Sequence, residues 1–323
     1  MGFDLSRRTP PSKRNGRPVR SLSKNSPTGD DSVVGPTGHV QFGLRRLAAL
    51  SQAAAANRSF VISSRVSIRG VSHAFSSGGP VLQGVDLEIE AGSFVALLGP
   101  SGCGKSTLLR FVSGLDAPAS GSVMLTPEGD AATSGAETKL AFVFQDAQLL
   151  PWRSVLDNVA LPLELQGLSR EEARKRARGP LAEVELSDVH ERFPDQLSGG
   201  MRMRVSIARA LVTEPGVLLL DEPFAALDEL TRQRLDERLR RLWLARRMTV
   251  IFVTHALAEA AFLAERALVM SRRPGRIVLD HHLELPEERT MDLRTNGAFV
   301  AQTALLYRAL QEHGGLDDSA EHA

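Results

Sequence analysis

Two kinds of apolar pattern along the chain predict strands. Apolar and polar residues alternate over 66–71 and 85–90, as expected for half-buried antiparallel strands. The runs 94–98, 217–221 and 249–253 are apolar almost throughout, which is typical of parallel strands covered on both faces. The sequence therefore predicts an antiparallel β subdomain joined to a buried parallel sheet.

A helical stretch interrupts this β framework. Strand patterns at 121–125 and 140–144 come first, and apolar residues then follow helical spacing from 154 to 211. Ser169 precedes Glu172 by three residues, which is the spacing of a capping box at the start of a helix. We therefore expect an inserted helical subdomain at about 150–212.

The second half of the chain has the pattern of a strand, a helix and a parallel strand. The segment 229–247 is amphipathic and rich in charge, and it joins the apolar runs 217–221 and 249–253. A hairpin over 267–279 and a closing helix over 298–311 follow. These patterns predict an α/β fold with a mixed core sheet.

The first sixty residues differ in composition from the rest. Residues 1–42 are rich in Arg, Lys, Ser, Pro and Gly, and such a segment cannot bury enough apolar surface to offset the entropy of ordering. We expect a disordered basic extension over 1–60, a folded domain over 64–283 and a helical tail over 284–323. The extension is open to several interpretations: a solvated tail or a start codon placed too far upstream, an organelle transit peptide, or a basic arm that contacts anionic lipid.

Charge and cysteine content narrow the classes of function. Residues 1–60 hold ten Lys and Arg against three Asp, whereas residues 61–323 hold 29 Lys and Arg against 35 Asp and Glu. The folded part is mildly acidic, so we expect no nucleic-acid partner. The single cysteine excludes an internal disulfide and fits a reducing compartment. No apolar run approaches the roughly 18 residues needed to cross a bilayer, so any role at a membrane is expected from beside it.

The most informative stretch lies between the strand 94–98 and a helical pattern that resumes near residue 108. It has the form G-x-x-x-x-G-K-S followed by a second hydroxyl, which is a phosphate-binding loop. Its residues are Gly99, Pro100, Ser101, Gly102, Cys103, Gly104, Lys105, Ser106 and Thr107. Glycines let backbone N–H groups turn toward an anion, and the helix start adds partial positive charge. Lys105 is expected to reach the β- and γ-phosphates and Ser106 to offer its hydroxyl to Mg²⁺, so this stretch predicts a magnesium-nucleotide site.

Cys103 occupies a free position of this motif, and two expectations attach to it. The helix start should favour its thiolate, which would make Cys103 a site of inhibition by thiol reagents. The alternative is a small, buried and inert residue.

Acidic, polar and glycine motifs follow at the ends of the predicted elements. Asp221 ends a buried strand, where a carboxylate can hold Mg²⁺ through water, and its neighbour Glu222 points another way. His255 ends the next apolar strand, at the carboxyl edge where open parallel sheets bind ligands. Ser198 and two glycines open a further helix, which is another anion-binding helix start.

These motifs stand in the order and spacing of the ATP-binding cassette (ABC) transporter ATPases, and the chain resembles that family over roughly 64–283. The matching segments are the Q-loop at 143–146, the signature at 197–201, the Walker B strand at 218–223, the D-loop at 226–228 and the H-loop at 253–255. The resemblance implies a P-loop NTPase fold of ABC type that binds ATP with Mg²⁺ and hydrolyses ATP to ADP and phosphate.

The resemblance also implies a role for individual residues. Glu222 would polarise the attacking water, and His255 would contact the γ-phosphate and hold Glu222 and the water in place. Gln145 would approach Mg²⁺ and the water as a sensor, which adds it to Ser106 and Asp221 as a metal residue. Phe75 resembles the A-loop aromatic that stacks on adenine; its alternative is a core aromatic.

The signature lies 93 residues after Lys105, so it need not meet the phosphates of its own chain. In the family two subunits pair head to tail, and the resemblance implies that Ser198, Gly199, Gly200 and Asp228 help to bind the partner's ATP. It further implies transmembrane permease subunits, a substrate-binding protein in the complex, and a peripheral position at the cytoplasmic face of the cell membrane, held by the permease.

Within the family, the segment 144–152 resembles the importer ATPases for nitrate, sulfonate, taurine and related small anions. Its part 149–152 has two interpretations: core packing at the subdomain junction, or a groove for a permease helix. The alternative function is a non-transport ABC-type ATPase that acts as a soluble regulatory or nucleic-acid-associated factor. The chain has one cassette, no long coiled-coil pattern and an intact Glu222, and these features favour the importer.

Overall fold

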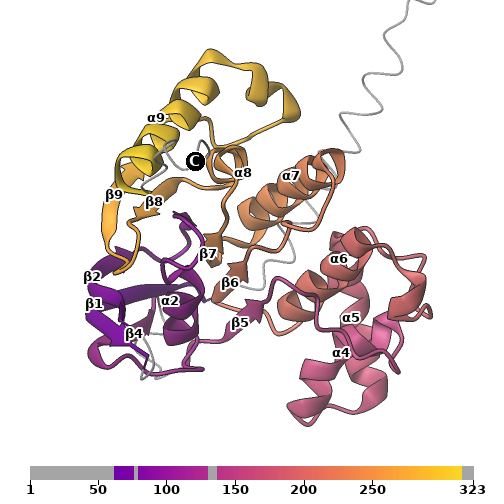
Figure 1. The fold of residues 1–323 in the computed structure, drawn as a ribbon. Coiled ribbons are helices and arrows are strands. Elements are labelled where there is room, and N and C mark those ends of the chain that lie inside the picture. The colour runs from indigo at the N-terminus through magenta and orange to yellow at the C-terminus, as the bar shows by residue number, and fades with distance from the viewer. Residues whose placement is uncertain (1–61, 76–78, 130–136, 315–323) are drawn as a thin grey trace, which may run out of the picture. The chain divides into compact units, whose positions relative to one another are not determined.

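A computed structural model describes residues 62–75, 79–129 and 137–314 of the chain (Figure 1). The predicted disorder of residues 1–60 lies outside these described residues. The strands are β1 Ser64–Ala74, β2 Pro80–Ile89, β3 Phe94–Leu98, β4 Ser120–Pro127, β5 Leu140–Val143, β6 Val217–Asp221, β7 Thr249–Val253, β8 Arg266–Met270 and β9 Ile277–His282. The α-helices are α2 Lys105–Val112, α4 Val155–Leu165, α5 Arg170–Glu183, α6 Gly199–Leu211, α7 Glu229–Arg246, α8 Leu257–Leu263 and α9 Gly297–Gly314, with short 3₁₀ helices η1 Pro194–Gln196 and η2 Met291–Thr295.

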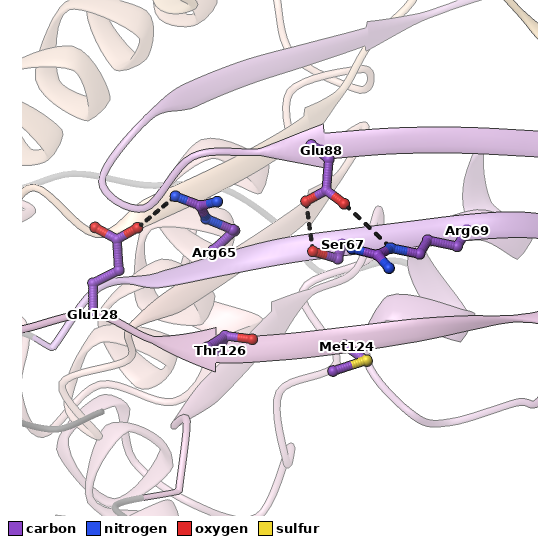
Figure 2. Close-up of a pocket in the computed structure, with 7 residues that line it drawn as sticks. All are labelled: Arg65, Ser67, Arg69, Glu88, Met124, Thr126 and Glu128. Atoms are coloured by element: carbon purple, nitrogen blue, oxygen red, sulfur yellow. Dashed lines mark hydrogen bonds and ion pairs between the residues drawn. The ribbon is translucent and has the colours of Figure 1, made fainter. Parts of the chain in front are cut away.

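The three-stranded sheet is antiparallel, with β1 between β2 and β4. Val66, Ile68 and Val71 of β1 are buried, whereas the residues between them line the opposite face, so the predicted alternation is confirmed. On that outer face Glu88 accepts from Ser67 and pairs with Arg69 (Figure 2). Arg69 offsets the negative charge of Glu88, and cross-strand contacts of this kind stabilise a sheet.

The six-stranded sheet has the order β5-β6-β7-β3-β8-β9. All neighbouring strands are parallel except β8 and β9, which form the predicted antiparallel hairpin. Every side chain of β3 is buried, and alternate side chains belong to two different apolar cores. One core includes α2 and the three-stranded sheet, and the other includes α7, α8 and α9. The large sheet is therefore covered on both faces, as its apolar runs predict.

The helices α4, α5 and α6 form the predicted helical group, which Figure 1 places beside the edge strand β5. Each begins at a serine, Ser154, Ser169 or Ser198, whose hydroxyl accepts from a backbone N–H three residues later. The capping box predicted at Ser169 is only half formed. The Glu172 backbone N–H donates to Ser169, but the Glu172 carboxylate instead accepts from Arg176, one turn further along.

A buried ion pair fixes the C-terminal segment against α7. Asp236 of α7 is fully buried and accepts from Arg294 of η2 at 2.5 Å, while the Arg294 guanidinium lies over the ring of Phe262. Burial raises the pKa of the Asp236 carboxyl well above its usual value, because the ionised form loses its hydration. In the described part of the tail, 284–314, Arg294 thus contacts the domain through both an ion pair and an aromatic ring. In the part of the chain described, no helix combines the length and apolarity that a membrane span requires.

We expect Asp236→Ala to destabilise the domain strongly, because the substitution leaves the Arg294 guanidinium without its buried partner. Breaking a buried pair of this kind costs about 3 kcal/mol or more. Urea denaturation followed by circular dichroism measures the change. Arg176→Ala, which removes an exposed helical pair, serves as the control and should leave the midpoint essentially unchanged. Equal midpoints for Asp236→Ala and the wild type would contradict the importance of the pair.

Candidate functional site

The phosphate-binding loop joins the buried strand β3 to the start of α2. Gly102 and Gly104 have φ values of 75° and 109°, in the left-handed region that side chains with a Cβ rarely adopt. A Cβ on Gly104 would also lie 2.6 Å from Leu82 Cδ2 of β2. Glycine is therefore required here both by backbone conformation and by the close approach of β2.

Lys105, in the first turn of α2, lies back across this loop. Its buried ammonium donates to the backbone carbonyls of Gly99 at 2.8 Å and Pro100 at 3.0 Å. An ammonium has three N–H donors, so one remains for a phosphate oxygen. The loop thus concentrates backbone N–H groups, a helix start and a cation in one place, which is the chemistry that binds a polyphosphate.

Ser106 and Asp221 meet across the sheet. Val217 and Leu219 of β6 face the core that contains α2, and Asp221 continues that alternation, so its carboxylate accepts from the Ser106 hydroxyl at 3.1 Å. Burial raises the pKa of Asp221, while the hydrogen bond from Ser106 opposes this shift. A hydroxyl and a carboxylate oxygen side by side are a suitable ligand pair for Mg²⁺.

Glu222 departs from the line of the strand. Its φ of 45° is left-handed, and its backbone N–H donates to Val253 O of β7 at 3.0 Å. This conformation costs about 1–3 kcal/mol. Oε2 of Glu222 lies 3.3 Å from Nδ1 of His255, just beyond the end of β7. The structure therefore brings Lys105, Ser106, Asp221, Glu222 and His255 to the same edge of the sheet.

The remaining predicted residues lie in other surroundings. Gln145 is exposed, just after β5. Ser198 caps α6, which Figure 1 places apart from α2, and a Cβ on Gly200 would lie 3.0 Å from Thr231 of α7. Asp228 caps α7 by accepting from the Thr231 backbone N–H. Hydrogen bonding from Thr231, first through its side chain and then through its backbone, lowers the pKa of the Asp228 carboxyl. The signature and the D-loop of one chain therefore adjoin each other rather than the phosphate loop of the same chain.

The family model described as "ABC transporter" matches residues 82–225. An aliphatic sulfonates import ATP-binding protein SsuB 1 from Rhizobium johnstonii is 44% identical over 77% of this chain and 88% of its own length. This chain belongs to the ABC transporter ATPase family.

Further matches lie within the same family. SsuB 1 from Mesorhizobium japonicum is 49% identical over 65% of this chain and 75% of its own length. Among solved structures, a match is the ATP-binding cassette MJ0796, described as dimeric and in a post-hydrolysis state bound to ADP and Pi. It is 35% identical with a TM-score of 0.59, and the match covers 68% of this chain and 100% of the MJ0796 chain. The predicted ABC-type α/β fold and the expected ATP-hydrolysing activity are thus confirmed.

In this ABC ATPase, two of the alternatives left open by the sequence are resolved. Phe75 is 50% exposed and makes an edge contact with His73, so the core-aromatic alternative is wrong, although stacking on adenine stays a prediction. Trp152 is 72% exposed, so core packing does not account for it. Leu149, by contrast, packs against the main apolar core.

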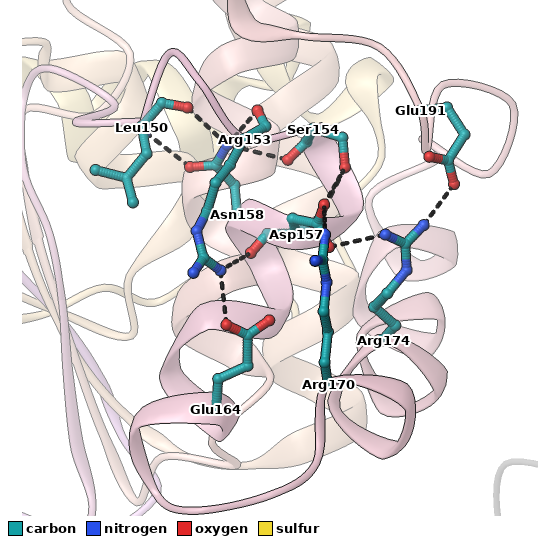
Figure 3. A network of polar contacts seen from close by, with 9 residues as sticks. All are labelled: Leu150, Arg153, Ser154, Asp157, Asn158, Glu164, Arg170, Arg174 and Glu191. Atoms are coloured by element: carbon teal, nitrogen blue, oxygen red, sulfur yellow. Dashed lines mark hydrogen bonds and ion pairs between the residues drawn. The ribbon is translucent and has the colours of Figure 1, made fainter.

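The segment between Gln145 and Trp152 is held by two side chains that the sequence patterns did not single out. Arg209 of α6 donates to the backbone carbonyls of Ala147 and Gln148 at 2.8 Å and 2.7 Å. The fully buried amide of Asn158 accepts from Leu150 N–H and donates to three backbone carbonyls between residues 150 and 154 (Figure 3). The available sequence signal was an asparagine near the start of a helical pattern. The hydrogen-bond partners of Asn158 depend on the tertiary fold.

The structure favours the second expectation for Cys103, a buried residue, over a reactive thiol. Cys103 is 2% exposed, and burial raises the pKa of its thiol even though the nearby Lys105 charge opposes the shift. The helix start cannot compensate, because desolvation of the thiolate outweighs it.

We therefore expect native Cys103 to react slowly with N-ethylmaleimide at neutral pH, with or without ATP. The raised pKa leaves little thiolate, so the rate should rise only toward alkaline pH. Mass spectrometry of intact protein measures the modification, and protein unfolded in urea, which should react fully, is the control. Rapid native labelling that ATP prevents would contradict the buried-thiol assignment.

Proposed function

We propose that this ABC ATPase is the energy-coupling subunit of an importer for sulfonates or similar small organic anions. The observation that carries the proposal is the extended similarity to several sulfonate import ATP-binding proteins. Those from Rhizobium johnstonii, Streptomyces avermitilis and Mesorhizobium japonicum are 44%, 48% and 49% identical over 77%, 70% and 65% of this chain. The arrangement of Lys105, Asp221 and Glu222 supports the ATP-driven part of this role. We further propose that the complete importer includes a substrate-binding protein.

In the proposed site, the loop from Gly99 to Thr107 holds the phosphates, and Phe75 stacks on adenine. Ser106 and Asp221 hold Mg²⁺, with Gln145 approaching the same ion. When bound, Mg²⁺ neutralises charge on the β- and γ-phosphates. The Ser106 to Asp221 hydrogen bond supports this assignment, because it already brings the two oxygen ligands together.

Glu222 then orients the attacking water. One of its oxygens lies near His255 Nδ1 and the other can accept from water, so the imidazole fixes the carboxylate while leaving it an acceptor. His255 would contact the γ-phosphate through its second ring nitrogen. The different partners of the two carboxylates support this division, since Glu222 contacts His255 whereas Asp221 accepts from Ser106.

The second half of each site comes from a second copy of the chain. Ser198, Gly199, Gly200 and Asp228 adjoin one another at the exposed start of α6 and α7, away from the phosphate loop of their own chain. A head-to-tail pair would bring them to the partner's ATP. The MJ0796 cassette, which is described as dimeric, supports this arrangement by analogy.

The exposed turn at Pro151 and Trp152 is the proposed contact for the transmembrane permease. Arg209 links the backbone after Gln145 to α6, and Asn158 links the turn to α4, so a shift at Gln145 would be transmitted to Trp152 through rigid hydrogen bonds. Through this contact the subunit would sit at the cytoplasmic face of the membrane. A structural neighbour, cbiO1 from Clostridium perfringens, is described as part of the ABC transporter complex cbiONQ.

We expect Glu222→Gln to lower ATP turnover at least a hundredfold while ATP affinity stays near that of the wild type. The amide can no longer act as a base, but the phosphate contacts remain. Trapped ATP should then shift the variant from monomer toward dimer, which sedimentation with and without Mg-ATP measures.

Two variants control this experiment. In the Glu222→Gln background, Lys105→Ala should abolish the dimer by weakening nucleotide binding, and Ser198→Arg should abolish it while ATP still binds. Near-normal turnover of Glu222→Gln would refute Glu222 as the base. A Glu222→Gln protein that binds ATP and stays monomeric at high concentration would refute the shared site.

We expect Trp152→Ala to abolish uptake while it leaves ATP affinity unchanged, because Trp152 lies on the surface and outside the phosphate site. Uptake of a radiolabelled alkanesulfonate by cells that carry the wild-type or variant gene in a deletion background measures this effect. Leu165→Ala, a second exposed apolar position in the helical group, is the matched control. Wild-type uptake of nitrate but not alkanesulfonate would overturn the proposed cargo, and normal uptake with Trp152→Ala would overturn the proposed contact.

A further inference from the structure

The hairpin loop between β8 and β9 packs directly on the phosphate loop. Gly275 donates from its backbone N–H to Val81 O at 2.8 Å and accepts from Gln83 N–H at 3.1 Å, so the hairpin is fixed to β2. A Cβ on Gly275 would lie 2.2 Å from Cys103 O, which leaves no room for any other residue. Ser271 closes the turn by accepting from the Arg276 backbone N–H at 3.1 Å. The loop is therefore a rigid platform against the phosphate-binding backbone.

Arg273 extends from this platform to the phosphate loop. Its Nε donates to the carbonyl oxygen of Gly102 at 2.7 Å, and its side chain is exposed. Among the described residues its guanidinium has no other hydrogen bond or ion pair. The neighbouring Arg272 is also exposed, but within the same described part of the chain its side chain makes no hydrogen bond or ion pair.

The bond to Gly102 has a consequence for the next N–H group. In a trans peptide the carbonyl and the following N–H point in opposite directions. With the Gly102 carbonyl directed outward to Arg273, the Cys103 N–H is directed into the loop, where it donates to Pro100 O at 3.4 Å and closes a turn over 100–103. Gly102 has a φ of 75°, and a Cβ there would meet no atom within 4 Å, so the peptide is held by hydrogen bonds to Arg273 and Pro100 and not by steric contact at Gly102.

We propose that Arg273 is a positioning residue for nucleotide binding: by holding the Gly102 carbonyl outward, it stabilises the turn that the Cys103 N–H closes on Pro100 O, and with it the shape of the phosphate loop. A reversed peptide would present a carbonyl dipole to the anion and repel it. This inference rests on the proposed role of the loop as the ATP site. Arg273 acts through the loop backbone and not by contact with the nucleotide.

The test uses the full chain and measures Mg-ATP affinity by calorimetry, together with KM, kcat and the melting temperature. Arg273→Ala should weaken ATP affinity and raise KM about fivefold, as expected for loss of one hydrogen bond. The kcat at saturating ATP should stay within about twofold of the wild type, because Glu222 and His255 are untouched. Arg272→Ala removes the same charge one residue away and should change none of these values.

Two further measurements separate positioning from simple attraction of charge. Arg273→Gln keeps a neutral hydrogen-bond donor and should recover part of the Mg-ATP affinity that Arg273→Ala loses. The loss of affinity in Arg273→Ala should persist at 0.5 M salt, where through-space attraction between charges is screened. Hydrogen exchange at the Cys103 amide in the absence of nucleotide should be faster in Arg273→Ala than in Arg272→Ala.

Each outcome decides between the proposals. Failure of the wild type to bind ATP would overturn the proposed function itself. Equal affinities for the wild type, Arg273→Ala and Arg272→Ala would overturn the role of Arg273 alone. A loss shared by Arg273→Ala and Arg272→Ala, or one that high salt removes, would assign the effect to charge and overturn positioning.

Discussion

The parallel pairing of β3, β7 and β6 is the constraint on which the site depends. Because these strands run in the same direction, their carboxyl ends emerge at one edge of the sheet. That edge carries the phosphate loop after β3, Asp221 and Glu222 at the end of β6, and His255 after β7. Burial on both faces holds the strands in register, so the apolar cores are also what fixes the distances between the polar groups.

A second set of contacts connects the loops around this edge. Arg232 of α7 donates to Leu227 O in the D-loop at 2.9 Å and pairs with the buried Glu259 of α8 at 3.4 Å. Glu259 in turn accepts from Thr254, the residue before His255. Burial raises the pKa of Glu259, while Thr254 and Arg232 oppose the shift. The H-loop and the D-loop are thereby tied to each other inside one chain.

The helical group is attached to the site in a different manner. It shares an apolar core with the large sheet, but its polar links to the segment after Gln145 are the side chains of Arg209 and Asn158. Both side chains donate to backbone carbonyls, so they hold the backbone between residues 147 and 154 whatever side chains that segment carries. This explains how a turn can present an exposed Trp152 in a defined position.

The sequence by itself determined the fold class, the order of the elements and the nucleotide motif. Strand and helix periodicity is local, and the glycines, Lys105 and Ser106 are adjacent in the chain, so their chemistry can be derived without coordinates. Residues that act across the sheet required the tertiary structure. The burial of Cys103 and the exposure of Phe75 depend on what packs against them, and the contact of Arg273 with Gly102 joins residues 171 positions apart. No pattern along the chain encodes such a contact, because its geometry exists only once β8 and β9 are placed beside β3.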